Sequence, residues 1–237
     1  MAVYVLVHGA WHGAWCWDKV VPLLEAEGHS VTAVDLPGHG GNPSDVAGMT
    51  LEAYGKTVSA AVYSLDGPVV VVGHSMGGMA ITQAAEYAPV HIGALVYVCA
   101  FLPGPGQSLL QLADNDPAAQ VIPNLQVDEQ AGICEVAPDA RVTCFYEECD
   151  PAEAAAASAR LVPESLAVFA APADVTEERA GSVRRIYVEC LRDRAISIAK
   201  QREMHNACPC ERVVAIDTDH SPFLSRPDEL AAHLLSV

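Results

Sequence analysis

A G-x-S-x-G sequence centred on Ser75 follows a run of four valines and precedes a helix-like segment. Because Gly73 and Gly77 lack side chains, they would let a strand and a helix pass close together around a strained turn that exposes the serine hydroxyl. The N-terminus of a helix starting at Met76 would favour the negative charge of a developing oxyanion. The pattern predicts nucleophilic acyl-transfer chemistry at Ser75; the alternative is a glycine-rich turn with an incidental serine.

A nucleophilic serine needs a base, and the chain has nine histidines. Only His220 follows directly after the last expected strand, with one C-terminal helix still to come. The chain order of serine, acid and histidine that accompanies this kind of turn also selects His220. His8 and His74 flank glycines and are expected to hold loops by hydrogen bonds. Five others lie where surface or helix-end histidines are ordinary: His29, His39, His91, His205 and His233.

The acid that orients this histidine is expected to follow one of the two preceding strands. After the first, no carboxylate occurs until Asp114. After the second, Asp193 stands at the carboxyl end of the strand, 27 residues before His220. Asp193 is therefore the predicted acid.

Three other carboxylates compete with Asp193 for this role. Glu189 and Asp217 lie within expected strands, and Asp219 is too close in sequence to His220 to turn back onto its ring. A different role for Asp193 also stays open, because it could pair with a neighbouring arginine on the surface.

An acyl-transfer serine also needs two N–H donors for the oxyanion. The amide of Met76 is one, and the amide of Ala10, in the His-Gly loop after the first strand, is the predicted second. His8 and His12 could face each other only on a helix, which Gly9 and Gly13 disfavour, so no metal site is expected. No cofactor is expected either.

Short β-branched runs alternate with amphipathic, helix-length segments, which predicts an α/β protein with a mostly parallel six-stranded sheet flanked by helices. The expected strands are Val3 to Val7, Ser30 to Asp35, Pro68 to Gly73, Gly93 to Phe101, Arg185 to Leu191 and Arg212 to Asp217. The expected helices are about Trp17 to Glu27, Leu51 to Leu65, Met76 to Tyr87, Ser197 to Asn206 and Pro227 to Leu235.

A proline-rich segment interrupts the alternation between the fourth and fifth expected strands. We therefore expect residues 1–102 and 183–237 to form the core and residues 103–182 to form an inserted cap, or lid, over the sheet edge. Within the cap, the sequence predicts a short extended piece at Arg141 to Tyr146 and a helix at about Pro151 to Leu161.

Composition excludes several classes of function. Thirteen Lys and Arg against 30 Asp and Glu give a net charge of −17, which argues against nucleic acid or an anionic membrane as a partner. No apolar run is long enough to span a membrane, and the first residues lack the features of a signal peptide, so a cytoplasmic location is expected. Eight scattered cysteines are too few for a disulfide scaffold; a Cys144–Cys149 bridge stays open.

Three segments together resemble the α/β-hydrolase subfamily of plant methyl esterases (methyl salicylate and methyl jasmonate esterases, polyneuridine aldehyde esterase) and hydroxynitrile lyases. They are Leu6 to Trp17, Val31 to Gly40 and Gly73 to Gly78. The resemblance implies an α/β-hydrolase fold and a tendency to form a homodimer. It also implies a triad and an oxyanion hole at the positions selected above: Ser75, Asp193, His220, Ala10 and Met76.

The chain departs from the lyases of this group at two positions. They carry a hydroxyl residue at the place of Ala10, and a lysine directly after the base, where this chain has Ser221. The expected activity is therefore that of a serine carboxylesterase. Its expected substrates are small, apolar esters, namely methyl or short-alkyl esters, including aromatic ones. The alternatives are a hydroxynitrile lyase acting on cyanohydrins and a non-catalytic small-ligand receptor of the same fold.

Overall fold

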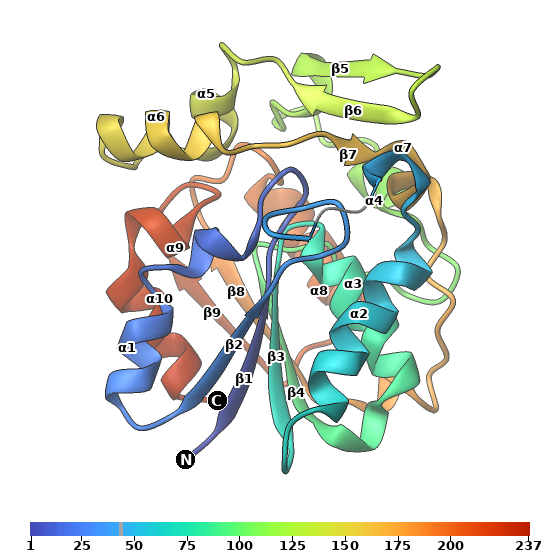
Figure 1. Cartoon of the computed structure of the whole chain (residues 1–237), viewed down its shortest axis with the longest axis vertical. Coiled ribbons are helices and arrows are strands. Elements are labelled where there is room, and N and C mark those ends of the chain that lie inside the picture. Colours follow the sequence, from blue (N-terminus) through green and yellow to red (C-terminus); the bar gives the residue numbers. More distant parts are fainter. Residues whose placement is uncertain (43–44) are drawn as a thin grey trace.

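The computed structural model describes residues 1–42 and 45–237 and is built around a six-stranded sheet (Figure 1). Every neighbouring pair of strands is parallel, and the strand order is β2-β1-β3-β4-β8-β9. The strands are β1 (Val3–Val7), β2 (Ser30–Val34), β3 (Val69–His74), β4 (Ile92–Val98), β8 (Arg185–Cys190) and β9 (Arg212–Ile216). The expected fold class is therefore confirmed.

Helices cover both faces of this sheet. Alternate side chains along each strand point to opposite sides, so each strand contributes apolar side chains to both layers of helices. In β1, Val5 and Val7 belong to one hydrophobic cluster, and Tyr4 and Leu6 belong to the other. The first cluster includes side chains of α2 (Leu51–Tyr63), α3 (Gly77–Tyr87) and α8 (Ile198–Ala207). The second includes side chains of α1 (Val21–Ala26), α9 (Pro222–Ser225) and α10 (Pro227–Leu235).

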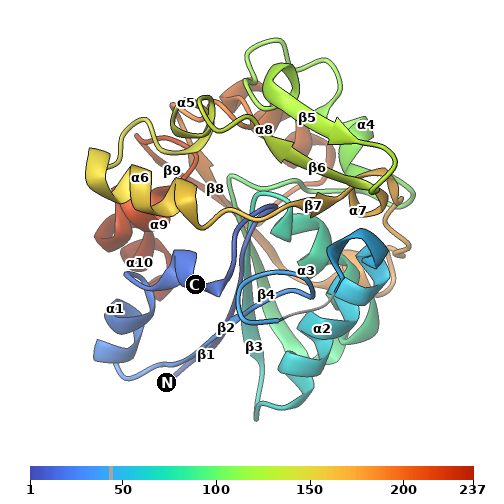
Figure 2. The same cartoon turned by 45° about the horizontal axis from the view of Figure 1, so that its top comes forward.

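Most of the residues between β4 and β8 form a layer above the carboxyl ends of the central strands, as Figures 1 and 2 show from two directions. This layer contains a second, antiparallel sheet of order β5-β6-β7, which the sequence analysis missed because its strands are very short. The helices and strands of the whole layer are α4 (Leu109–Ala113), β5 (Leu125–Asp128), β6 (Ile133–Val136), α5 (Arg141–Phe145), α6 (Pro151–Ala159), β7 (Glu164–Ser165) and α7 (Leu166–Ala170).

Three of the expected secondary-structure elements differ from the structure. The fourth strand ends at Val98, because Cys99 has a φ of 35° and turns the chain. The segment expected to be extended from Arg141 forms helix α5, whose first residue is held by guanidinium hydrogen bonds to the carbonyls of Val136 and Ser158. The helix expected from Trp17 begins only with α1, after a 3₁₀ turn over Ala14–Trp17.

Candidate active site

Ser75 occupies the sharp turn between β3 and α3. Its φ is 54°, in the left-handed region. This conformation costs a non-glycine residue free energy, and residues that adopt it cluster at functional sites. The turn is tightly enclosed: a Cβ on Gly77 would lie 2.6 Å from the His8 carbonyl oxygen, and one on Gly73 would lie 2.7 Å from the Gly77 carbonyl oxygen. Both glycines are therefore required by close backbone approach, as the sequence analysis anticipated.

The backbone around Ser75 is anchored on both sides. Its carbonyl oxygen accepts hydrogen bonds from the amides of Gly78 and Phe101, both at 3.0 Å. Its side chain is almost buried, with the residue 8% exposed, and it lines a pocket. The hydroxyl is thus presented to a cavity from a fixed backbone.

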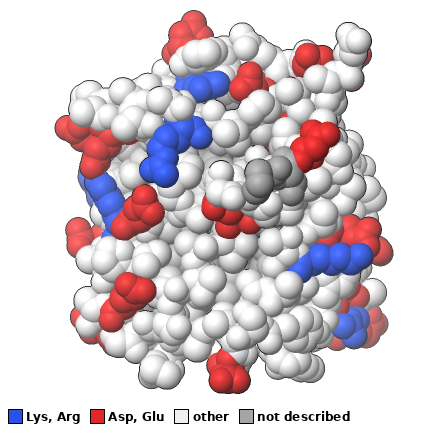
Figure 3. Space-filling model, in the orientation of Figure 1, with Lys and Arg blue, Asp and Glu red and all other residues white. Residues whose placement is uncertain are grey.

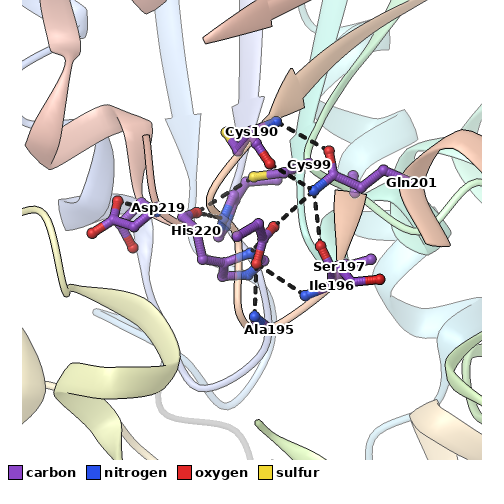
Figure 4. Close-up of polar contacts among 12 residues, drawn as sticks. Cys99, Cys190, Ala195, Ile196, Ser197, Gln201, Asp219 and His220 are labelled. Atoms are coloured by element: carbon purple, nitrogen blue, oxygen red, sulfur yellow. Dashed lines mark hydrogen bonds and ion pairs between the residues drawn. The ribbon is translucent and has the colours of Figure 1, made fainter. Parts of the chain in front are cut away.

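Asp193 and His220 are in direct contact. Asp193 lies in the loop between β8 and α8, and its Oδ2 is 2.7 Å from Nδ1 of His220. Its Oδ1 accepts from the amides of Ala195 (2.7 Å) and Ile196 (2.9 Å), and its Oδ2 also accepts from Nε2 of Gln201 at 3.1 Å (Figure 4). A carboxylate on Nδ1 fixes the tautomer of the imidazole and leaves Nε2 as the basic nitrogen.

His220 is held beside the serine turn by the residue that precedes Ser75. Nε2 of His74 donates to the His220 carbonyl oxygen at 2.8 Å, and the two ring centroids are 4.5 Å apart. His74 is fully buried, which lowers its pKa well below the usual range and keeps its ring neutral. The structure therefore brings the Asp193–His220 pair to the same carboxyl edge of the sheet as Ser75.

The competing carboxylates are occupied elsewhere. Glu189 accepts hydrogen bonds from Arg202 at 3.0 and 3.2 Å and from His205 at 2.9 Å; burial opposes ionisation, but these partners lower the pKa of Glu189. Asp217 pairs with Arg192 at 2.9 Å.

Asp219 does not reach the ring of its neighbour. It accepts from the amides of Glu148 and Ser221 instead, while burial raises its pKa. The alternative role for Asp193, a surface pair with a neighbouring arginine, is not found among the described residues, since Arg192 and Arg194 pair with other carboxylates.

Ala10 and Met76 line the same pocket as Ser75. Within the described residues 1–42 and 45–237, no acceptor is found for the backbone amide of either residue. Free amides beside a nucleophile can donate to a developing oxyanion. Both sequence-selected donors are therefore placed at the serine.

His12, which the sequence analysis considered only as a metal ligand, stiffens the loop that carries Ala10. Its Nδ1 lies 2.8 Å from the Ala10 carbonyl oxygen and its Nε2 lies 2.7 Å from the hydroxyl of Tyr146. Burial lowers the pKa of His12 to about 3, so its neutral ring can donate at one nitrogen and accept at the other. His8 similarly holds its loop, since its Nε2 accepts from the amide of Leu36 at 3.0 Å.

The part of the chain that the structure describes has one group of three buried residues with metal-ligating atoms within 4.8 Å of one another: His74, Cys99 and His220. Burial raises the pKa of the Cys99 thiol well above its usual range, which disfavours the thiolate that a metal needs. The sulfur lies 3.4 Å from the His220 carbonyl oxygen, which it can contact as a weak donor. Cys99 therefore packs against the His220 backbone as a neutral thiol.

Residues 4–233 match the model of the alpha/beta hydrolase family. The chain belongs to this family. It is 37% identical over 247 residues to Methylesterase 7 of Arabidopsis thaliana, covering 99% of this chain and 95% of that protein. It is 35% identical over 249 residues to Salicylic acid-binding protein 2 of Nicotiana tabacum, covering 99% and 96%. A solved structure of a polyneuridine aldehyde esterase mutant matches with a TM-score of 0.89 and 30% identity, covering 99% and 98%.

These comparisons confirm the expected family and support the expected enzyme class, a carboxylic ester hydrolase. The similarity extends over nearly the whole length of the relatives, so it includes the layer above the sheet. No described helix is long and apolar enough to cross a membrane.

The pocket of this α/β-hydrolase is formed between the serine turn and the upper layer. Trp11 forms one wall: its indole nitrogen donates to the Cys134 carbonyl oxygen at 3.0 Å, and its ring centroid is 5.7 Å from those of Phe145 and Phe169. The remaining lining is mostly aliphatic: Leu109, Leu110, Ala113, Ala119, Val121, Ile122, Leu125, Ala195 and Ile196. Such a lining suits an apolar ligand.

Proposed function

We propose that the protein is a serine carboxylesterase that hydrolyses small, neutral, largely apolar esters, with a methyl or short-alkyl alcohol portion. One observation carries this proposal: the strained Ser75 lines a single apolar pocket together with Ala10 and Met76, whose amides have no acceptor among the described residues. The names of the relatives, methylesterase and esterase, support the same class of substrate.

In the proposed first step, Nε2 of His220 takes the Ser75 hydroxyl proton as the serine oxygen attacks the ester carbonyl. The carbonyl π electrons move onto oxygen, and the amides of Ala10 and Met76 donate to that oxyanion. Asp193 stabilises the imidazolium across the 2.7 Å contact. The tetrahedral intermediate then expels the alcohol, which receives the proton from His220, and an acyl-serine remains.

In the second step, His220 deprotonates a water molecule that attacks the acyl-serine. Its collapse returns the proton to Ser75 and releases the carboxylic acid. The reaction consumes one ester and one water and yields one acid and one alcohol. No cofactor is needed for it.

The polar residues of the pocket support a neutral substrate. The ammonium of Lys200 donates to the Asp114 carbonyl oxygen at 2.9 Å and pairs with Glu203 at 2.9 Å, and Asp116 accepts from the amide of Ser197 at 2.9 Å. Because both charged groups already have partners, the surface left for a ligand is mainly hydrocarbon. We expect a substrate with an ionised group to be disfavoured there.

The division into core and cap, the cellular location and the oligomeric state belong to the same proposal. Residues 103–182 would act as the cap that shapes the pocket, on a core of residues 1–102 and 183–237. All eight cysteines are free thiols, which suits a reducing compartment such as the cytoplasm. The homodimer implied by the family resemblance can be tested by light scattering on the purified chain.

The test is a comparison of wild type with Ser75→Ala on p-nitrophenyl esters and aromatic methyl esters of increasing acyl size. We expect turnover that depends on Ser75 and falls when the acyl group carries a charge. Mandelonitrile serves as a second substrate, because cyanide release without ester turnover would favour a lyase. Tight binding of an ester without turnover by a folded protein would favour a receptor.

A further inference from the structure

Gln201 is a fully buried glutamine that the serine chemistry does not require by type, and it lies directly behind the Asp193–His220 pair. It lies on α8, three residues after the first residue of that helix. In Figure 4 its side chain points from α8 toward Cys190, at the end of β8, and toward Ile196, in the loop between β8 and α8. No sequence motif marked it.

Every polar atom of this side chain is used. Its Oε1 accepts from the Cys190 amide at 3.1 Å, and its Nε2 is close to three acceptors. These are the carbonyl oxygens of Cys190 (3.2 Å) and Ile196 (2.8 Å) and Oδ2 of Asp193 (3.1 Å). One amide therefore joins the last residue of β8, the far side of the loop and the carboxylate between them.

The carboxylate oxygen contacted by Gln201 is the one that faces His220. Oδ2 of Asp193 accepts from both, whereas Oδ1 is held by the loop's own amides. Removing the Gln201 donor would leave Oδ2 with His220 as its only partner among the described residues. The carboxylate would then be freer to rotate, and its negative charge would be shared with one donor fewer.

We propose that Gln201 is a positioning residue that holds the Asp193 carboxylate in line with His220 and draws part of its charge away from the imidazole. This inference rests on the proposed function, since it assigns Gln201 a role through the acid of that reaction. A purely structural glutamine would fix the loop without changing the charge that the imidazole experiences.

Gln201→Met is the principal variant, because it keeps the length of the side chain and removes every hydrogen bond. We expect kcat to fall about 10- to 100-fold, with KM nearly unchanged, because the substrate pocket is not touched. We also expect the acidic limb of the kcat/KM profile to move to higher pH, since a less shared carboxylate stabilises the imidazolium more strongly.

Gln201→Glu adds a test that does not depend on the loss of a side chain. When protonated, the new carboxyl can donate to Asp193 Oδ2 and accept from the Cys190 amide, so it replaces part of the native network. When ionised, it repels Asp193 and loses its donor. We therefore expect kcat of Gln201→Glu to recover toward the wild-type value as the pH is lowered toward neutrality and to fall as the pH rises.

Gln83→Met is the matched control. Gln83 is an equally buried glutamine that bonds to the Asp174 backbone at 2.9 and 3.0 Å and to the Tyr87 hydroxyl, but it does not contact Asp193 or His220. Its substitution is expected to lower the melting temperature while leaving the pH limb in place. If Gln201→Met and Gln201→Glu reproduce only this behaviour, the positioning role is wrong.

A readout without substrate separates this proposal from the proposed function. The proton between His220 Nδ1 and Asp193 should give a low-field NMR resonance in the wild type that Asp193→Asn abolishes. We expect Gln201→Met to shift this resonance and its titration, and Gln83→Met to leave both unchanged. An unshifted resonance in a folded Gln201→Met overturns the inference whatever the esterase assay shows; absence of wild-type ester turnover overturns only the function.

Discussion

At the scale of single residues, the carboxylate of Asp193 decides which nitrogen of His220 is basic. The Asp193→Asn variant replaces one acceptor oxygen by a donor, so the imidazole loses the partner that holds its proton on Nδ1. We expect kcat to fall about 10⁴-fold with little change in KM, measured by steady-state hydrolysis of a p-nitrophenyl ester.

Asp217→Asn is the control for this prediction, because Asp217 was a rival for the same role. Its carboxylate pairs with Arg192 at the surface, and its side chain is 71% exposed. The variant should keep wild-type turnover. A loss at Asp217 that matches the loss at Asp193 would mean that the acid has been assigned to the wrong residue.

The residues of the candidate site differ in how visible they are in the sequence. Ser75 is marked by flanking glycines, and His220 by its place after the last strand, so local signals suffice for both. Gln201 carries no such signal, because its contact with Asp193 depends on how α8 packs against β8. His12 was visible as a residue but not as a loop support, since its partner Tyr146 lies 134 residues away.

At the scale of elements, a buried ion pair joins β7 of the upper layer to the loop after β2. Oε2 of Glu164 lies 3.1 Å from Nε2 of His39, both side chains are fully buried, and the Tyr54 hydroxyl donates to Oε1 at 2.8 Å. The expectation of a surface or helix-end position for His39 is therefore wrong. Burial alone would lower the pKa of His39, but the contact with Glu164 and its charge outweigh burial and raise it.

The Glu164→Gln variant removes this charge and leaves His39 without compensation. We expect about 3 kcal/mol lower free energy of unfolding near pH 6, together with a higher KM if the upper layer loosens. Because the folded pKa of His39 is raised, the pair stabilises fully below the unfolded value near 6.5 and loses its effect as the pH rises through the folded value. Urea unfolding at pH 6 and pH 9 should therefore show the larger difference at pH 6.

The control for the ion pair is Glu135→Gln. Glu135 lies 3.8 Å from Arg141 in the same layer, and its side chain is 41% exposed, so solvent screens the interaction. Little change in stability is expected at either pH. Equal destabilisation by both variants would show that burial of the Glu164 pair has no special effect.

The order of elements was predictable because buried parallel strands leave continuous valine and isoleucine runs, as in β3 and β9. The upper layer gave weaker signals. Strands β5 and β6 have four residues each, and the five residues of α5 are too few to show a period that separates a strand from a short helix. The contact of Glu164 with His39 is tertiary, so no local pattern announces it.

At the scale of the whole molecule, several buried histidines make the fold sensitive to acid. Burial lowers the pKa of His8, His12 and His74, and that of His12 falls to about 3. Below about pH 6.5 the unfolded chain binds protons that the folded chain cannot. The free energy of unfolding therefore falls as the pH is lowered. For His12 alone this loss is about 3 kcal/mol between pH 7 and pH 4.

The His12→Gln variant should have a flatter stability profile between pH 7 and pH 4, measured by urea unfolding at intermediate pH values. The exposed His91 provides the control, and His91→Gln should keep the wild-type slope. The variant must be compared by slope, because loss of the Ala10 and Tyr146 contacts lowers its stability at every pH. An unchanged slope would mean that His12 takes up its proton in the folded state.

The net charge of −17 gives the last prediction, because it acts on substrates before they reach the pocket. Acidic groups are spread widely over the face seen in Figure 3. Asp116, which is partly exposed, lines both the apolar pocket and a more open hollow beside it. An ester with a carboxylate on its acyl group should therefore be about 10-fold slower in kcat/KM than a neutral ester of equal size at low salt. Raising the ionic strength from 0.01 M to 0.15 M shortens the Debye length from about 30 Å to about 8 Å.

This screening should raise kcat/KM for the anionic ester and leave the neutral ester unchanged, because only the first is repelled at long range. Stopped-flow rates at several salt concentrations would measure both slopes. Equal slopes would show that long-range charge does not select substrates. A salt-independent preference for the neutral ester would assign the selection to the apolar pocket wall alone, where the cost is that of removing a carboxylate from water.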